Sequence, residues 1–100
     1  MKVKSNILLR PLAQEDLINI WLYTYSNWGD RQADSYLDGL QSALEYLSDN
    51  PLVCREREEF NPAVRIYNFE EHIVVYQIDS SCIDVIRVLH KSMDIESQID

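Results

Sequence analysis

One hundred residues suit one domain with a single core, and we expect one domain over residues 1–100. Hydrophobic residues make up 46% of the chain, but no apolar run approaches the ~20 residues that cross a bilayer, which excludes a membrane-spanning protein. The first residues also lack the apolar core of a signal peptide. We therefore expect a cytoplasmic protein that does not bind membranes.

The charge balance is strongly acidic, with 17 acidic and 9 basic residues and a formal net charge of −8. Proteins that bind nucleic acid through its phosphates are usually basic, because released counterions supply much of the affinity. We therefore expect no strong direct binding to nucleic acid. The expected partners are proteins that present a basic or an apolar face.

Cysteines and histidines give no sign of a cofactor. Cys54 and Cys82 lie in different predicted elements without metal-ligand spacing, and a reducing cytosol favours small, partly buried thiols. A disulfide between them is the alternative. His72 and His90 are too isolated to suggest a metal site, so no cofactor is predicted.

The first half of the chain predicts a strand and two helices. Residues 2–10 alternate apolar and polar positions, as a strand with one buried face does. Residues 12–28 repeat apolar positions at helical spacing, and Gly29 suits the end of that helix. A second amphipathic helix is predicted over residues 31–48, before Pro51. The short gap between the helices favours an antiparallel helical hairpin.

The second half predicts a sheet. A charged loop over residues 52–62 precedes three strands at residues 64–69, 72–79 and 83–90, and tight connections make them a meander. The polar tail after Lys91 is expected to fray. The order β-α-α-β-β-β predicts an α+β fold, an antiparallel sheet with the helical hairpin packed on one face and the first strand at an edge.

Short motifs along nearly the whole chain resemble one known family. The motif positions are Ala13, Asp16, Leu17, Ile20, Trp28, Gly29, Ala33, Tyr36, Asn50, Pro51, His72, Val74, Tyr76, Ile86, Arg87, Val88, Leu89, His90, Met93 and Asp94. In this order they resemble the ParE branch of the ParE/RelE superfamily, the toxins of bacterial type II toxin–antitoxin modules. The Arg-Val-Leu-His run that ends the last strand is the most specific of them.

This resemblance implies a toxin that inhibits DNA gyrase by binding it, without being an enzyme, and that a ParD-like antitoxin neutralises. A homodimer and a toxin–antitoxin hetero-oligomer both remain open. The end of the last strand carries a local basic cluster on an acidic body, so we expect Arg87, His90, Lys91 and Met93 to contact the target. A degenerate toxin that keeps only antitoxin binding and co-repression is a further alternative.

The first helix carries more aromatic residues than one buried face can hold. Tyr23 and Tyr25 cannot both face the sheet together with Trp21, so at least one of them should be exposed. An exposed aromatic beside Leu22 would anchor an antitoxin segment or a second toxin copy. We therefore predict Leu22, Tyr23 and Tyr25 as antitoxin-binding residues. The alternative is that these tyrosines are incidental surface residues.

The runner-up function is a RelE-like, ribosome-associated endoribonuclease that cleaves mRNA. It would use Glu59 as base, Arg65 on the phosphate and His90 as acid, if their strands approach one another. Each residue also has a structural interpretation. His90 could bond to the backbone at the strand end, and Arg65 and Arg87 could pair with Asp84 or Glu59. The scarcity of lysine, with Lys91 the last of three, argues against RNA binding.

Overall fold

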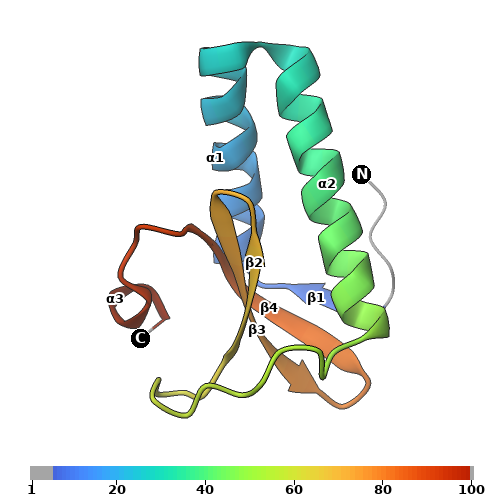
Figure 1. The fold of residues 1–100 in the computed structure, drawn as a ribbon, viewed down its shortest axis with the longest axis vertical. Helices are drawn as coiled ribbons and strands as arrows, with labels where there is room; N and C mark the ends of the chain where they lie inside the picture. Colours follow the sequence, from blue (N-terminus) through green and yellow to red (C-terminus); the bar gives the residue numbers. More distant parts are fainter. Residues whose placement is uncertain (1–5, 100) are drawn as a thin grey trace.

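The computed structural model describes residues 6–99 as a helical hairpin standing on a four-stranded sheet (Figure 1). The elements in chain order are β1 (Ile7–Leu9), α1 (Pro11–Trp28), α2 (Asp30–Asp49), β2 (Arg65–Phe69), β3 (His72–Asp79), β4 (Cys82–His90) and α3 (Ile95–Ile99). The predicted α+β order is confirmed up to β4. The part of the first strand predicted at residues 2–5 lies outside the described residues.

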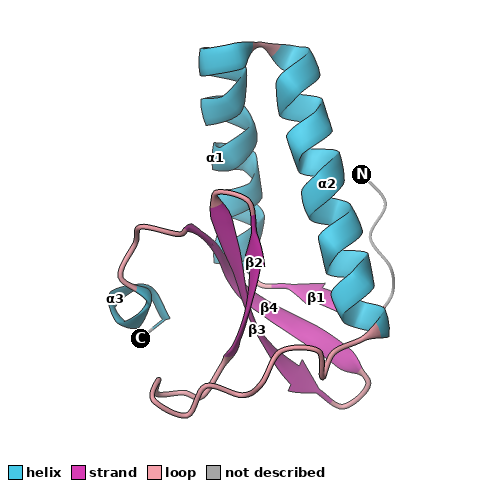
Figure 2. Cartoon of the chain, in the orientation of Figure 1, coloured by secondary structure: helices cyan, strands magenta, loops and turns pink. Residues whose placement is uncertain are grey.

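The helical hairpin follows from residues at its ends. Pro11 begins α1, where the amide hydrogen that proline lacks would have no partner in the helix. Gly29 alone separates α1 from α2 and has a φ of +89°, a left-handed value that glycine adopts without strain. Its backbone N–H donates to the carbonyl of Tyr25 over 2.9 Å, which closes the last turn of α1. Figure 2 shows the two helices side by side, with the strands grouped at their open ends.

The sheet order is β1-β4-β3-β2, with antiparallel pairing from β2 to β4. β1 lies at an edge, as predicted, but it pairs parallel to β4, so the expectation of a purely antiparallel sheet is wrong for this strand. The reason is that α2 returns the chain to the end where β1 begins, since the Asn6 side chain donates to the Ser48 carbonyl. β2 therefore runs in the same direction as β1. Each of the two following hairpins reverses the chain, so β4 runs parallel to β1.

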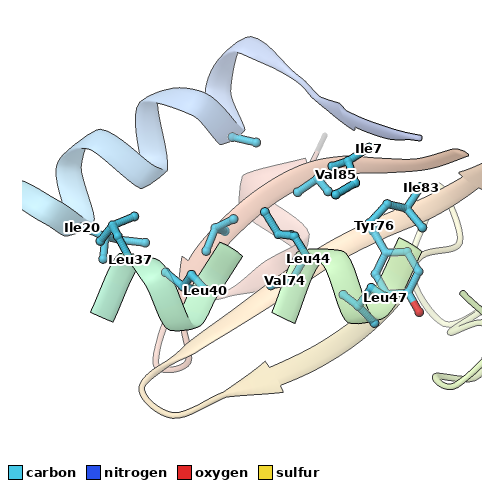
Figure 3. Close-up of a cluster of buried hydrophobic side chains, with 12 residues drawn as sticks. Ile7, Ile20, Leu37, Leu40, Leu44, Leu47, Val74, Tyr76, Ile83 and Val85 are labelled. Carbon is cyan, nitrogen blue, oxygen red and sulfur yellow. The ribbon is translucent and has the colours of Figure 1, made fainter. Parts of the chain in front are cut away.

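Both faces of the sheet are covered. The residues that α2 buries against the sheet are Leu37, Leu40, Leu44 and Leu47, which meet Val74, Tyr76, Ile83 and Val85 (Figure 3). A second cluster occupies the other face and contains Val64, Ile73, Val75, Ile86, Leu89 and Ile99. Successive residues of β3 therefore belong to different clusters, as strand geometry requires.

The carboxyl-terminal tail is ordered, so the prediction that it frays is wrong. α3 is a helix of five residues, and it buries Ile99 against the second cluster while Ile95 packs beside it. Five residues are too few to show helical periodicity in a sequence. The tail folds because Ile86 and Leu89 would otherwise expose the second face of β4.

The loop after α2 is tied to the sheet by two partly buried hydrogen bonds. The Tyr76 hydroxyl donates to the Pro51 carbonyl over 2.9 Å, and the Arg65 guanidinium donates to the Cys54 carbonyl. Tyr76 has no exposed surface. Both side chains serve the fold in these positions. The thiols of Cys54 and Cys82 are free, so the alternative of a disulfide between them is wrong.

Gly39 lies where α2 approaches β2 closely, because an added Cβ would come 2.8 Å from Phe69 Cζ. Alanine is normally better than glycine in a helix by about 1 kcal/mol. Here we expect Gly39→Ala to destabilise the protein by about 1 kcal/mol, since overpacking costs about 1–3 kcal/mol. Urea unfolding measures the change. In a Phe69→Ala background the same substitution should be stabilising; a loss of stability there would contradict the proposed clash.

Candidate functional site

A groove of about 750 Å³ lies between the helical hairpin and the ends of β3 and β4. Its lining includes Tyr23 and Trp28 from α1, Tyr36 from α2, and Met93 after β4. The groove also contains Arg87 and His90. It therefore joins one residue predicted to bind an antitoxin with three predicted to contact the target.

No helix within residues 6–99 is long and apolar enough to cross a membrane.

Asp16 and Arg87 form the best-bonded ion pair of the groove. The Arg87 Nε and Nη2 atoms each lie 2.8 Å from one oxygen of the Asp16 carboxylate. These bonds raise the pKa of Arg87 above its ordinary value. The remaining Arg87 Nη1 atom reaches the backbone and side-chain oxygens of Gln98 on α3. With only 16% of its side chain exposed, Arg87 connects α1, β4 and α3.

Asp16 also closes the edge of the sheet. The β1 ladder ends with the bond from the Arg10 N–H to the Val85 carbonyl, because the chain enters α1 at Pro11. Farther along β4, the backbone N–H of Val88 points to the same edge and donates to Asp16 Oδ2 over 2.9 Å. One carboxylate thus satisfies both an edge amide and a guanidinium. The sequence marked Asp16 as a family motif position, but its bonds to Arg87 and Val88 were not predicted.

Two histidines lie side by side in the floor of the groove. The rings of His72 and His90 have their centroids 5.5 Å apart and meet edge to face. The Tyr36 hydroxyl lies 2.7 Å from His72 Nδ1. His90 Nδ1 accepts the backbone N–H of Ser92 over 3.2 Å, so the predicted bond between His90 and the backbone at the strand end is confirmed. The same Nδ1 atom also lies 2.7 Å from the Ser92 hydroxyl oxygen.

The environment of His72 predicts a loss of stability in mild acid. Burial lowers the pKa of His72, and the neighbouring His90 lowers it further, against weaker opposing effects of Glu71 and Asp16. The unfolded chain therefore binds a proton more tightly than the folded one. The stabilisation is complete above the ordinary histidine value of about 6.5 and is lost as the pH falls through that value toward the lower folded pKa.

Urea unfolding at about pH 7.5 and about pH 5.5 should therefore show a lower free energy of unfolding at the acidic value. His72→Gln should flatten this dependence, because glutamine does not titrate. The carboxylates change little in this window, since their ordinary pKa values lie near 4. An equal slope in the wild type and in His72→Gln would assign the acid sensitivity to other groups.

The expected basic cluster at the end of β4 is neutralised by acidic partners. Lys91 Nζ lies 2.7 Å from Glu71 Oε2 in an exposed ion pair, which lowers the pKa of Glu71. Arg87 is neutralised by Asp16. The expectation of a free positive patch is therefore wrong. The sequence could not show it, because Asp16 and Arg87 are separated by 71 residues.

The pairings predicted for the other charged residues are also different. Asp84 pairs with Arg10, with a shortest N···O distance of 2.8 Å, and Glu59 pairs with Arg57 over 2.7 Å. Arg65 bonds to a backbone carbonyl instead of a carboxylate. Neither Asp84 nor Glu59 therefore takes the role of partner to Arg65 or Arg87.

The residues of the predicted nuclease site do not converge. β3 separates β2 from β4, and its residues Tyr76 and His72 pair with Arg65 and His90 respectively. Four residues of strand, about 13 Å, therefore separate Arg65 from His90 along the sheet. Glu59 is paired with Arg57 in the loop before β2. The arrangement offers no shared phosphate site for Glu59, Arg65 and His90.

The three predicted antitoxin-binding residues are exposed but do not share one surface. Tyr23 lines the groove, and its ring lies 6.2 Å from that of Trp28 in an edge contact. Leu22 and Tyr25 are half-exposed and lie outside the groove lining. Consecutive residues of a helix are rotated by about 100°, so Tyr25 points about 160° away from Tyr23.

Comparisons with known proteins identify the family and agree with this fold. A family model described as the ParE toxin of the type II toxin-antitoxin system parDE matches residues 7–95. Toxin ParE1 of Mycobacterium tuberculosis is 38% identical, over 97% of this chain and 100% of the relative. Toxin ParE1 of Caulobacter vibrioides is 31% identical, over 87% of this chain and 90% of the relative.

The fold is shared with a solved structure described as the chromosomal ParDE TA system from P. aeruginosa. The TM-score is 0.75 at 16% identity, covering 85% of this chain and 94% of that one. The chain belongs to the ParE family, the toxins of ParDE type II toxin–antitoxin systems. The predicted family is thereby confirmed.

Proposed function

We propose that this chain inhibits DNA gyrase and that a ParD-like antitoxin neutralises it by occupying the groove. The observation that carries the proposal is the shared groove itself. Tyr23, from the predicted antitoxin set, lines the same surface as His90 and Met93, from the predicted target set. An antitoxin seated there would cover the target contacts, so neutralisation needs no change in the shape of the toxin.

The groove suits an apolar segment of a partner. Its wall combines the aromatic rings of Tyr23 and Trp28 with aliphatic side chains of Ile20, Val88 and Leu89. A segment that is disordered alone would gain enough apolar contact here to offset the entropy of ordering. Among the three residues predicted to bind the antitoxin, Tyr23 belongs to this surface.

The turn after β4 is the proposed contact with gyrase. His90, Lys91 and Met93 are exposed there, and Met93 leaves 49% of its surface open. The turn is fixed by bonds from the Lys91 amide to the Glu71 carbonyl and from the Met93 amide to the His90 carbonyl. Arg87 lies in β4, shortly before this turn, and acts as a positioning residue. Its guanidinium is already bound by Asp16 and Gln98.

A supercoiling assay with purified gyrase tests both halves of the proposal. The chain should block supercoiling, and the cognate antitoxin should restore it. The double variant Lys91→Ala/Met93→Ala should inhibit about tenfold less, as expected for loss of exposed anchor contacts. Tyr23→Ser/Trp28→Ser should still inhibit gyrase, but should need about tenfold more antitoxin for neutralisation.

Leu52→Ser is the control variant. Leu52 is exposed, lies outside the groove lining and is far from the groove residues in the sequence, so this variant should behave as the wild type. Unaffected supercoiling at high toxin excess would reject gyrase as the target. A stable antitoxin complex in that case would instead support a degenerate toxin that retains only its partner.

A further inference from the structure

The side of the hairpin that faces away from the groove carries a second apolar surface, the outer face, made of Ile18, Trp21, Leu22 and Tyr25 on α1. Ile18 exposes 60% of its surface, and Leu22 and Tyr25 expose 50% each, while Trp21 is partly buried and also packs against the first core cluster. None of the four lines the groove. A surface helix normally buries one stripe and turns a polar stripe to water. α1 is therefore unusual in having an apolar stripe left over after folding.

The aromatic residues of the outer face are held in place. The Trp21 ring stacks on the Tyr25 ring with the centroids 5.1 Å apart and an angle of 7° between the planes. Trp21 Nε1 donates to Asp34 Oδ1 over 2.9 Å, so the indole bridges from α1 to α2. Rigid aromatic groups lose little entropy when a partner covers them.

The spacing of the four residues points to a helix as the partner. Positions 18, 21, 22 and 25 follow the i, i+3, i+4, i+7 pattern by which one helix packs along another. A helix laid along this stripe would rest beside α2 as well, because Trp21 reaches Asp34. The docked helix would contact both α1 and α2, as the third member of a three-helix arrangement.

The charge beside the stripe defines the chemistry of that helix. Asp30, Asp34 and Asp38 are exposed and lie one helical turn apart along α2. Within residues 6–99 none of them takes part in an ion pair, and Arg31 beside them leaves the row with net negative charge. A basic flank on the docked helix would complement this row.

We propose that the outer face binds an amphipathic helix of another protein, with Lys or Arg along the flank that meets Asp30, Asp34 and Asp38. A second copy of this chain fits poorly, since it brings the same net charge of −8 and the same acidic row. The proposal goes beyond gyrase inhibition and antitoxin binding, because the groove on the opposite side stays open.

The probe is a synthetic Leu/Lys amphipathic peptide of about 18 residues, which forms about 27 Å of helix. A matched peptide replaces every Lys with Glu and keeps the apolar face. Amide chemical-shift mapping on the full chain should place the Lys peptide on the outer face. Ile18→Ser/Leu22→Ser should weaken its binding about tenfold, by loss of apolar contact. Leu52→Ser should not change it.

Asp34→Asn/Asp38→Asn tests the charge, since the amide oxygen of an asparagine side chain can still accept the hydrogen bond from Trp21. This variant should weaken the Lys peptide about tenfold at low salt and less at high salt. The proposal is overturned if neither peptide binds, if the Glu peptide binds equally well, or if Ile18→Ser/Leu22→Ser has no effect. It is also overturned if sedimentation reveals a dimer of the chain that this double variant dissociates.

Discussion

Asp16→Ala is expected to lower the free energy of unfolding by about 3 kcal/mol, the cost of leaving a largely buried charge without its partner. The substitution removes both bonds to Arg87 and the bond to the Val88 amide. Asp16 exposes 12% of its side chain, so water replaces the lost partner poorly. A loss of this size corresponds to a fall of about 12–24 °C in the melting temperature of a domain this small.

A matched double variant separates the cost of the unpaired Arg87 charge from the cost of the unpaired Val88 amide. Asp16→Ala/Arg87→Met removes both charges and should recover about 1–2 kcal/mol relative to Asp16→Ala, because no guanidinium is left without a partner. Circular dichroism during urea unfolding measures both variants. A cost below about 1 kcal/mol for Asp16→Ala would show that the pair behaves as an exposed surface pair.

Tyr76→Ala should cost about 3–5 kcal/mol, as large-to-small substitutions of buried aromatic residues do. Tyr76 is the largest fully buried side chain within residues 6–99, and it packs between α2 and the sheet. Its hydroxyl also ties the sheet to the Pro51 carbonyl at the end of α2. At 25 °C, unfolding of the variant should begin at much lower urea concentrations than unfolding of the wild type.

Tyr76→Phe provides the control, because it keeps the ring and removes the hydroxyl. Its expected cost is about 1 kcal/mol, the usual contribution of one hydrogen bond, with the Pro51 carbonyl left without this donor. Burial raises the pKa of Tyr76, so ionisation at high pH should destabilise the wild type more than this variant. Similar costs for the alanine and phenylalanine variants would contradict a packing role for the ring.

Periodicity alone predicted most of the fold. The helices are long, and their apolar positions recur every three or four residues; the bounds predicted for the second helix differ from those of α2 by one residue at each end. The hairpins of β2, β3 and β4 followed from alternation and tight connections. The parallel pairing of β1 could not be predicted in this way, because it depends on where α2 returns the chain.

The site was harder to predict, because its contacts join residues far apart in sequence. The motif positions of the last strand and of the turn after it marked Arg87, His90 and Met93, but no local pattern indicates that Asp16 neutralises Arg87. The groove residues Tyr36 and His72 were matched as family positions, but their mutual bond was not predicted. Counting charges along the sequence therefore predicted a basic cluster at Arg87 and Lys91. In the folded protein these two residues form ion pairs with Asp16 and Glu71.

The neutralised turn has a consequence for recognition. Since Lys91 and Arg87 already have acidic partners, attraction of an acidic target by net charge contributes little there. The proposed target contact would therefore depend more on the exposed Met93 and on the shape of the turn. Loss of Met93 should therefore weaken target binding more than loss of Lys91 does, which the two single alanine variants would show in the supercoiling assay.

The far end of the helical hairpin extends beyond the sheet (Figure 1). Around Gly29 the two helices are supported mainly by each other, through residues such as Thr24 and Ala33. Local opening of these turns should therefore need less free energy than opening of the sheet, and their amide hydrogens should exchange with deuterium sooner. A protein that binds this end of the hairpin adds its binding free energy to the free energy of local opening. Slower hydrogen–deuterium exchange in these turns would therefore show that such a protein is bound.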